Sequence, residues 1–454
     1  MKQLGLILLL SFSFSCATYY QVNQEFNSRF EQGNLASAEK FLKKNKTKRT
    51  KFLYYANRGV VNSMEGNYEQ SNSWLERAYI YNEDYRKKAT DVAASFLVNP
   101  TVIPYQAEDH EQLLLLYFKA LNYLKINDYE SALVECRRLN LQLDELSDKY
   151  KSDKKYKRDA FIQNLMGIAY EASGDVNNAF IAYRNAYKVY KEDFTNLFGV
   201  GAPDQLKKDL LRTAYLNGFQ SDLDFYEREF DMKYKHDSKE SEMVFFWHNG
   251  LGPVKGEWSI NFAVQGGGDG FVTFANSEQG MTYPFPISSL SSDQSNSLKN
   301  LEVFRVAFPK YVERPPSFSS AYIETKNGRY NLELAEDVNQ IAFKTLEERM
   351  LKELGKGLLR AALKKATETA VREESEGWGA VLGMVNAFTE RADTRNWQTI
   401  PHSIYYTRVP LKVGDNQVKL KTQNFQNGGS ATESFTFSVS RKGQTVFHSF
   451  QSLQ

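Results

Sequence analysis

The chain has 454 residues, of which 42% are hydrophobic and 25% charged, with a formal net charge of +2 at pH 7. This is the composition of a folded protein long enough for two or three domains. Its charge, close to neutral, argues against a protein that binds the phosphate backbone of nucleic acids.

The N-terminus has the features of a bacterial export signal. A positive charge at Lys2 precedes an apolar run over residues 4–14, which is too short to span a bilayer, and Cys16 follows small residues. A cysteine directly after the cleavage site is where bacterial lipoproteins receive their lipid. We therefore expect a signal peptide over residues 1–15, lipidation at Cys16 as the membrane anchor, and a tether over residues 16–25.

An ordinary export signal is the alternative. Lipoprotein signals usually carry Leu three residues before the cysteine, where this chain has Ser13, and Ser13 and Ser15 also satisfy the small-residue rule of an ordinary signal peptidase. Cleavage by that enzyme would release a soluble protein beginning at Cys16. With Cys16 lipidated, only Cys136 remains, which excludes an intrachain disulfide and a cysteine-based metal site.

A pattern of small residues and turns recurs through residues 26–235. In three copies a small residue precedes a turn of Gly or Asn, and another small residue follows three or four positions into the next segment; a weaker copy surrounds Gly33. The turn residues tolerate the left-handed backbone at a helix end, and the small residues let two antiparallel helices cross closely. The pattern predicts helix–turn–helix units and resembles the tetratricopeptide (TPR) repeat. Its copies have their turns at Gly33, Gly66, Asn127 and Gly174.

The copies are spaced more widely than the roughly 34 residues of a TPR. Their small residues Gly59, Ala120 and Gly167 are 61 and 47 residues apart, so inserted segments separate the units. Stacked helix pairs form a solenoid with a concave face. We expect this face to be a groove that holds a peptide or a partner helix, with Tyr123 and Tyr183 as candidate contacts. Packing between repeats is the alternative role for each aromatic residue.

Beyond residue 240 the sequence changes to short β-type segments separated by turn residues. Asn327-Gly328 between two such segments is a strong hairpin signal. Pro309 is expected to end the strand over residues 303–308. The other expected strands cover residues 244–247, 257–264, 321–325, 329–334, 403–409, 416–421, 433–440 and 445–450.

Apolar residues at helical spacing interrupt these strands over about residues 335–391. The apolar segment 378–388 is expected to fold back as the second arm of a helical hairpin. The sequence therefore predicts an α+β multidomain protein. An N-terminal TPR-like α-solenoid over residues 26–235 is followed by an antiparallel β-sandwich-like domain over residues 240–454 with an inserted helical hairpin.

Three stretches resemble a known family: residues 249–255 (NGLGPVK), 308–311 (FPKY) and 392–401 (ADTRNWQTIP). They look like signature stretches of an uncharacterised family of bacterial TPR-repeat lipoproteins of the cell envelope, and the likeness covers most of the mature chain. The resemblance implies a place near envelope-biogenesis components, including activators of peptidoglycan synthases. It implies no activity, because the family supplies no established one.

The last of these stretches contains two candidate site residues, Arg395 and Trp397, with two alternative roles. Asp393 and Arg395 could form a buried ion pair that orients the loop into the next strand, with Trp397 in the core. Alternatively, Arg395 and Trp397 could be partner-binding anchors, because Arg and Trp are natural anchors of protein interfaces.

The sequence contains no recognisable catalytic constellation. Its five histidines are scattered, without the i, i+4 pair of a helical metal site. The glycine runs near residues 250 and 266 lack the pattern of a dinucleotide or phosphate loop, and Cys136 lies at a packing position. We therefore expect no catalytic residues, no cofactor and no metal.

The expected function is that of a non-enzymatic, exported lipoprotein at the outer membrane, which acts as an interaction scaffold or adaptor for envelope protein partners through its TPR-like groove. The alternative is a binding protein or hydrolase for cell-wall or surface polymers that uses a cleft in the C-terminal β domain. Its mark would be a polar pocket with converging carboxylates. A weaker alternative is insertion of segment 378–388 into a membrane or a partner.

Overall fold

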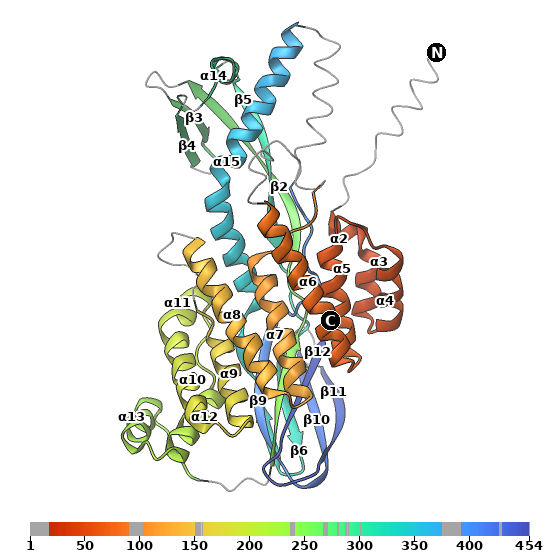
Figure 1. Ribbon diagram of the computed structural model, residues 1–454, viewed down its shortest axis with the longest axis vertical. Helices are drawn as coiled ribbons and strands as arrows, with labels where there is room; N and C mark the ends of the chain where they lie inside the picture. Colours follow the sequence, from red (N-terminus) through yellow and green to blue (C-terminus); the bar gives the residue numbers. More distant parts are fainter. Residues whose placement is uncertain are drawn as a thin grey trace.

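A computed structural model describes residues 18–89, 103–149, 156, 158–236, 241–266, 271–278, 281–286, 288, 290–299, 301–374, 392–425 and 429–453. Within these residues, a helical TPR-like region over residues 19–230 comes first and is followed by β-sheets with a few helices. The protein is therefore the predicted α+β multidomain protein. Figure 1 shows the helical region, coloured red to yellow-green, as an arc beside the sheets.

The helical region consists of antiparallel helix pairs joined by tight turns. The backbone is left-handed at each predicted turn, with φ of 73° at Gly33, 82° at Gly66, 60° at Asn127 and 89° at Gly174, which confirms the four turns. A fifth turn, at Gly218 with φ of 70°, escaped the sequence pattern. The pairs are α3 (Gln24–Glu31) with α4 (Leu35–Lys44), α5 (Lys51–Met64) with α6 (Tyr68–Ala89), α7 (Asp109–Lys125) with α8 (Tyr129–Lys149), α9 (Ala160–Ala172) with α10 (Val176–Val189), and α12 (Asp204–Leu216) with α13 (Gln220–Phe230).

Two glycines allow paired helices to approach closely, as the small-residue pattern predicts. A Cβ atom on Gly59 would lie 2.4 Å from the side chain of Leu75, and one on Gly167 would lie 2.4 Å from the ring of Tyr183. Both of these large side chains are fully buried. Tyr183 therefore fills the crossing between α9 and α10.

Replacing Gly167 by Ala should destabilise the protein, although Ala is the better helix former. Overpacking against Tyr183 costs about 1–3 kcal/mol, while the gain in helix propensity is about 1 kcal/mol, so we expect a net loss of up to about 2 kcal/mol. The loss should appear as a lower urea midpoint at unchanged slope. Gly201→Ala, in the loop before α12, is the control for the added methyl group alone, because nothing lies within 4 Å of it. Equal midpoints for the two variants would contradict the close crossing.

The N-terminal segment expected to be a tether is largely helical. α2 (Tyr19–Val22) and the start of α3 lie within it, and Thr18 caps α2 by accepting a hydrogen bond from Gln21 N. This segment is also fastened to the C-terminal half, because Tyr19 N donates to Thr394 Oγ1 at 3.1 Å. Residues 16 and 17 of the expected tether lie outside the described part.

The described strands form three sheets. Sheet A has the order β12-β1-β9-β8, sheet B the order β4-β3-β2-β5, and sheet C the order β11-β10-β6-β7. The Asn-Gly signal is confirmed, since β6 and β7 form a hairpin that the pair Thr325–Gly328 closes. The strands are β1 (Ser241–Asn249), β2 (Val254–Gly266), β3 (Phe271–Asn276), β4 (Met281–Pro286), β5 (Val303–Val312), β6 (Phe318–Thr325), β7 (Gly328–Asn331), β8 (Glu333–Glu336), β9 (Ser403–Leu411), β10 (Gly414–Asn424), β11 (Ser430–Val439) and β12 (Thr445–Ser452).

Sheet A is the middle layer between the helical region and sheet C. Val244 and Phe246 on one face of β1 pack against the helices, while Phe245 and Trp247 on the other face pack against sheet C, because side chains alternate along a strand. Sheets A and C form the predicted sandwich. The sandwich is not purely antiparallel, which corrects the prediction, because β12 pairs in parallel with β1. The two predicted domains share one hydrophobic core through sheet A.

Sheet B differs from the prediction at Pro309. The strand β5 does not end there but continues to Val312, and Pro309 is paired with Glu257 of β2. Proline has no amide proton for the ladder, and it is tolerated here because β5 is an edge strand.

Two helices pack on sheet B. These are α14 (Ser292–Lys299) and the 37-residue helix α15 (Val338–Glu374), which is the first arm of the predicted hairpin. Asp337 starts α15, since its Oδ1 accepts a hydrogen bond from Gln340 N at 2.9 Å. Segment 378–388, the expected second arm, lies outside the described residues. Among the helices of the described part, none combines the length and the hydropathy that a membrane crossing requires.

Candidate functional site

The inner face of the helical region is not an open groove. Its aromatic residues contact the C-terminal half of the chain, with ring centroids 5.8 Å apart for Phe118 and Trp397 and 6.2 Å apart for Phe161 and Phe246. Tyr183 is fully buried near the same sheet. This corrects the expectation that the inner face holds a peptide or a partner helix, because the chain's own β-sheet covers it.

An open groove lies instead between α6 and α8, with α7 as its floor. It has a volume of about 480 Å³, and Tyr123 lines it with a half-buried side chain. Of the two tyrosines predicted as partner contacts, Tyr123 is the one at an accessible surface. The other lining residues are polar or charged, and the sequence analysis singled out none of them: Glu69, Asn72, Ser73, Glu76, Lys119, Glu135 and Arg138.

Four of these charges form a closed network in the groove. Lys119, with a side chain only 3% exposed, pairs with Glu76 and, at 2.6 Å, with Glu135, and Arg138 pairs with the same two carboxylates at 3.1 and 2.9 Å. Burial opposes the ionisation of Glu76, but its hydrogen bonds with Arg138 and Lys119 outweigh burial and lower its pKa. The groove therefore presents fixed charges of both signs beside an aromatic ring, which suits a polar protein surface better than a small apolar ligand.

Tyr183 belongs to a buried network that joins the helices to sheet A. Its hydroxyl accepts a hydrogen bond from Arg408 Nη2 at 2.7 Å and donates one to Glu171 Oε2 at 2.9 Å. Arg408 also pairs with Asp209 at 2.9 Å, with Glu171 at 2.8 Å and with Glu242. Burial favours the neutral acid, yet the neighbouring arginines hold the pKa of Glu171 well below its ordinary value. These contacts give Tyr183 a structural position.

Arg395 and Trp397 lie as in the first of the two predicted alternatives, a buried ion pair beside a tryptophan in the core. Arg395 is buried and forms a bidentate pair with Asp393, with Nε–Oδ1 at 2.8 Å and Nη2–Oδ2 at 2.7 Å. Trp397 is fully buried, and its Nε1 donates to Thr399 Oγ1 at 2.8 Å. In this conformation neither side chain offers a partner more than a small exposed area.

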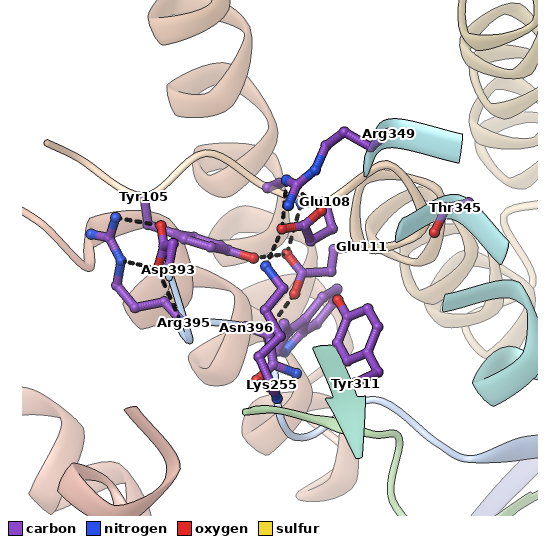
Figure 2. A network of polar contacts seen from close by, with 12 residues as sticks. Tyr105, Glu108, Glu111, Lys255, Tyr311, Thr345, Arg349, Asp393, Arg395 and Asn396 are labelled. Atoms are coloured by element: carbon purple, nitrogen blue, oxygen red, sulfur yellow. Dashed lines mark hydrogen bonds and ion pairs between the residues drawn. The ribbon is translucent and has the colours of Figure 1, made fainter. Parts of the chain in front are cut away.

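The three stretches that resemble the lipoprotein family, residues 249–255, 308–311 and 392–401, meet at the start of α7 (Figure 2). Lys255 of the first stretch pairs with buried Glu108, which also pairs with Arg349 of α15 at 2.7 Å. Tyr311, from the second stretch, lies edge-on to His110 of α7, with ring centroids 5.6 Å apart.

The third stretch joins this junction through backbone contacts. Trp397 N donates to Glu111 Oε1 at 2.6 Å, and the side chain of Asn396 donates to Pro253 O at 2.8 Å. No local pattern identifies these partners, because they are more than 130 residues apart along the chain.

Two carboxylates at the junction have pKa values shifted in opposite directions. Burial disfavours the charge on Glu108, but Arg349 and Lys255 outweigh it and lower its pKa to about 2. Burial and the charge of Glu108 raise the pKa of Glu111 to about 7. Such a pair can mark an active site. Here, however, the neighbouring cavity lined by His110 has a volume of only about 10 Å³, enough for about one water molecule, so the geometry is that of a structural junction.

Two buried acids that line the same small cavity, Asp159 and Glu336, make the stability of the fold depend on pH. Burial raises the pKa of Asp159 to about 6, and burial with the charge of Asp159 raises that of Glu336 well above its ordinary value. The folded chain thus holds protons that the unfolded chain releases, so this pair lowers stability as pH rises above about 4.5. We expect Glu336→Gln to be more stable than wild type at pH 8, with the difference in urea midpoint shrinking towards pH 5. The exposed Glu347→Gln is the charge-matched control, and an equal gain at both pH values would contradict the shift.

A second open cavity, of about 420 Å³, lies at the edge of the sandwich and is here called the β-edge cleft. Its polar part has His402 paired with Glu313 at 2.9 Å and the nearby carboxylate of Asp337, whose pKa burial raises. Its apolar part includes Tyr405 and Phe425, the latter 64% exposed. The sequence analysis assigned no residue of this cleft to a binding site, because its parts come from five separate segments.

The remaining predicted residues have simple outcomes. Cys16 and the signal peptide lie outside the described residues. Cys136 is buried, and burial raises its thiol pKa to about 12, as expected for an unreactive packing residue. In the described part of the chain, no group of His, Cys, Asp or Glu side chains is arranged to hold a metal ion.

Comparison with solved structures gives likenesses to TPR-like repeat proteins over about half of the chain. No protein-family model matches the chain, and no curated protein matches it. Among solved structures, TPR-like repeats of a putative kinesin light chain from Podosopora anserina match with a TM-score of 0.32 and 12% identity, covering 47% of this chain and 92% of that one. BtubC from P. vanneervenii matches with a TM-score of 0.32 and 14% identity, covering 48% and 82%. MamA of AMB-1 matches with a TM-score of 0.28 and 10% identity, covering 46% and 94%. At such scores these likenesses carry no argument, and the TPR-like description rests on the helix pairs and their turns.

Proposed function

We propose that the protein is an exported lipoprotein, anchored through Cys16 at the outer membrane, and that it is a non-enzymatic scaffold for envelope protein partners. The observation that carries this proposal is the open groove at Tyr123. It is an accessible hollow of the helical region, and four of its charges, those of Glu76, Lys119, Glu135 and Arg138, neutralise one another. A partner can therefore dock there without leaving a buried charge unpaired.

The proposal is tested by native co-purification of the full-length protein from detergent-solubilised envelopes. We expect a stoichiometric protein partner that is lost from Tyr123→Ala and retained by Tyr215→Ala, an exposed tyrosine outside the groove. Retention of the partner by both variants would exclude the groove. Turnover of a glycan or peptide by the purified protein, abolished by a single carboxylate change, would overturn the non-enzymatic role.

Membrane anchoring is tested separately through Cys16. Wild-type protein should incorporate labelled palmitate and fractionate with outer membranes, whereas Cys16→Ala should do neither. Release of an unlabelled soluble protein from wild-type cells would support the ordinary export signal instead.

The β-edge cleft favours a second candidate function, the binding or hydrolysis of cell-wall or surface polymers. The cavity contains two carboxylates, a histidine and exposed aromatic surface. Such a combination suits a site that binds or hydrolyses carbohydrate. Co-sedimentation with insoluble peptidoglycan should then weaken in Phe425→Ala but not in Phe271→Ala, an exposed Phe on sheet B. Release of soluble fragments that Glu313→Gln abolishes would indicate a hydrolase, and no sedimentation of wild type would remove this candidate.

A further inference from the structure

The connection between α4 and α5 concentrates the positive charge of an otherwise balanced chain. Residues 40–51 contain seven Lys or Arg and no Asp or Glu, although the whole chain carries a net charge of only +2. Five basic side chains at the tip of this segment are exposed to solvent: Lys43, Lys44, Lys46, Lys48 and Arg49. We call these five residues the basic loop.

Most of this charge has no counterion among the described residues. Lys43 pairs with Glu39 at 2.7 Å. For Lys44, Lys46 and Lys48, no described carboxylate lies within ion-pair distance. Like charges held together without counterions raise the local potential and attract an anionic surface.

Half-buried aromatic rings lie beside the basic loop. Tyr55 of α5 stacks with Trp74 of α6 at 5.8 Å and meets Tyr81 edge-on at 6.5 Å. Lys46 Nζ lies 4.9 Å from the ring of Tyr54, and Lys51 Nζ lies 5.1 Å from that of Tyr81. Tyr and Trp beside Lys is the combination found at the level of lipid headgroups, where the rings are amphipathic and the lysine stems are long enough to reach phosphates.

The basic loop also lies on the side of the molecule where the described chain begins. Arg49 O accepts a hydrogen bond from Arg395 Nη1 at 3.1 Å, and the neighbouring Thr394 accepts one from Tyr19 N at 3.1 Å. Only Thr18 precedes Tyr19 in the described part. A lipid on Cys16 would therefore enter the bilayer close to this loop, because two residues span at most about 7 Å.

We propose that the basic loop, with Tyr55, Trp74 and Tyr81, is a docking surface for anionic phospholipid headgroups. It holds the folded protein against the membrane in addition to the lipid at Cys16. This inference rests on the proposed membrane anchoring. Each Lys or Arg near an anionic surface adds to the binding, so the basic loop would orient the folded protein on the bilayer that the lipid reaches.

Vesicle flotation of the purified mature chain, without residues 1–15 and carrying Cys16→Ser, tests the surface without its lipid. We expect binding to vesicles of equal parts phosphatidylglycerol and phosphatidylcholine, little binding to phosphatidylcholine alone, and release by high salt. Lys44→Glu, Lys46→Glu and Lys48→Glu combined should weaken binding by about 100-fold or more. The control is Lys412→Glu, Lys419→Glu and Lys442→Glu, exposed lysines on and around sheet C that change the net charge equally.

The outcomes separate this inference from the proposed anchoring. Equal loss in both triple variants would overturn it, since net charge alone would then explain binding. Absence of vesicle binding, with palmitate incorporated at Cys16 in wild type, would overturn the docking surface and leave the anchor standing. If the basic-loop triple variant loses vesicle binding and wild type incorporates no palmitate, the result would support the docking surface and contradict the lipid anchor. Tighter binding to duplex DNA than to vesicles would reassign the basic loop to phosphate polymers.

Discussion

Replacing Arg408 by Met should cost about 3–5 kcal/mol of unfolding free energy, because it removes the cation at the centre of a buried network. Arg408 touches Asp209, Glu171 and Glu242, and Arg212 also pairs with the first two of these carboxylates, so the variant leaves three buried or half-buried acids with less positive charge around them. The measurement is urea unfolding at pH 7, read as the midpoint at constant slope.

The pH dependence of this variant provides a second check. In wild type the arginines keep the pKa of Glu171 below its ordinary value, so the network stabilises the fold above about pH 4.5 and loses its contribution as the pH falls. The deficit of Arg408→Met should therefore shrink towards pH 4. Arg158→Met is the control, because Arg158 pairs with Glu192 and Asp193 at the surface, where such pairs contribute at most about 1 kcal/mol. Equal losses in both variants would show that the network does not carry this stability.

Replacing Trp397 by Ala should cost about 3–5 kcal/mol, the usual loss for a fully buried tryptophan. The ring lies between Phe52 and Phe118, with centroids at 6.5 and 5.8 Å, so its removal opens a cavity between the helices and the C-terminal half. Thermal unfolding should occur at a markedly lower temperature and with reduced cooperativity. Trp258→Ala, on half-buried Trp258 of sheet B, should cost less.

The same variant decides between the two roles proposed for Trp397. Normal melting combined with loss of a co-purified partner would favour a binding anchor, against the buried position seen here. A strong loss of stability with the partner retained at low temperature would assign Trp397 to the core. Measuring both quantities on one preparation keeps the two outcomes distinct.

Much of the helical region was predictable because its signals are local. A left-handed residue must stand where a helix pair turns, and Gly33, Gly66, Asn127 and Gly174 tolerate that backbone at low cost. The hairpin at Asn327-Gly328 follows from the same kind of constraint. Such features depend on a few adjacent residues, so their sequence is sufficient to identify them.

What covers the inner face could not be predicted in this way. Phe118 and Phe161 have the helical spacing of apolar residues whether a partner or the chain's own sheet buries them, because periodicity shows which face is buried and not what it contacts. Likewise, the pairing of β12 with β1, and the tolerance of Pro309 in β5, depend on the order of strands in a sheet.

Local backbone preferences and apolar patterning are enough to place four of the five described helix pairs and the strands of the sandwich from the sequence. The export signal at Cys16 stays a prediction. The tertiary fold alone sets which candidate residues are accessible. It buries Tyr183, Arg395 and Trp397, leaves Tyr123 in an open groove, and brings the charges of Glu108, Lys255 and Arg349 together. The physical reason is that burial and charge pairing depend on residues more than a hundred positions apart, whose meeting is set by the packing of whole layers.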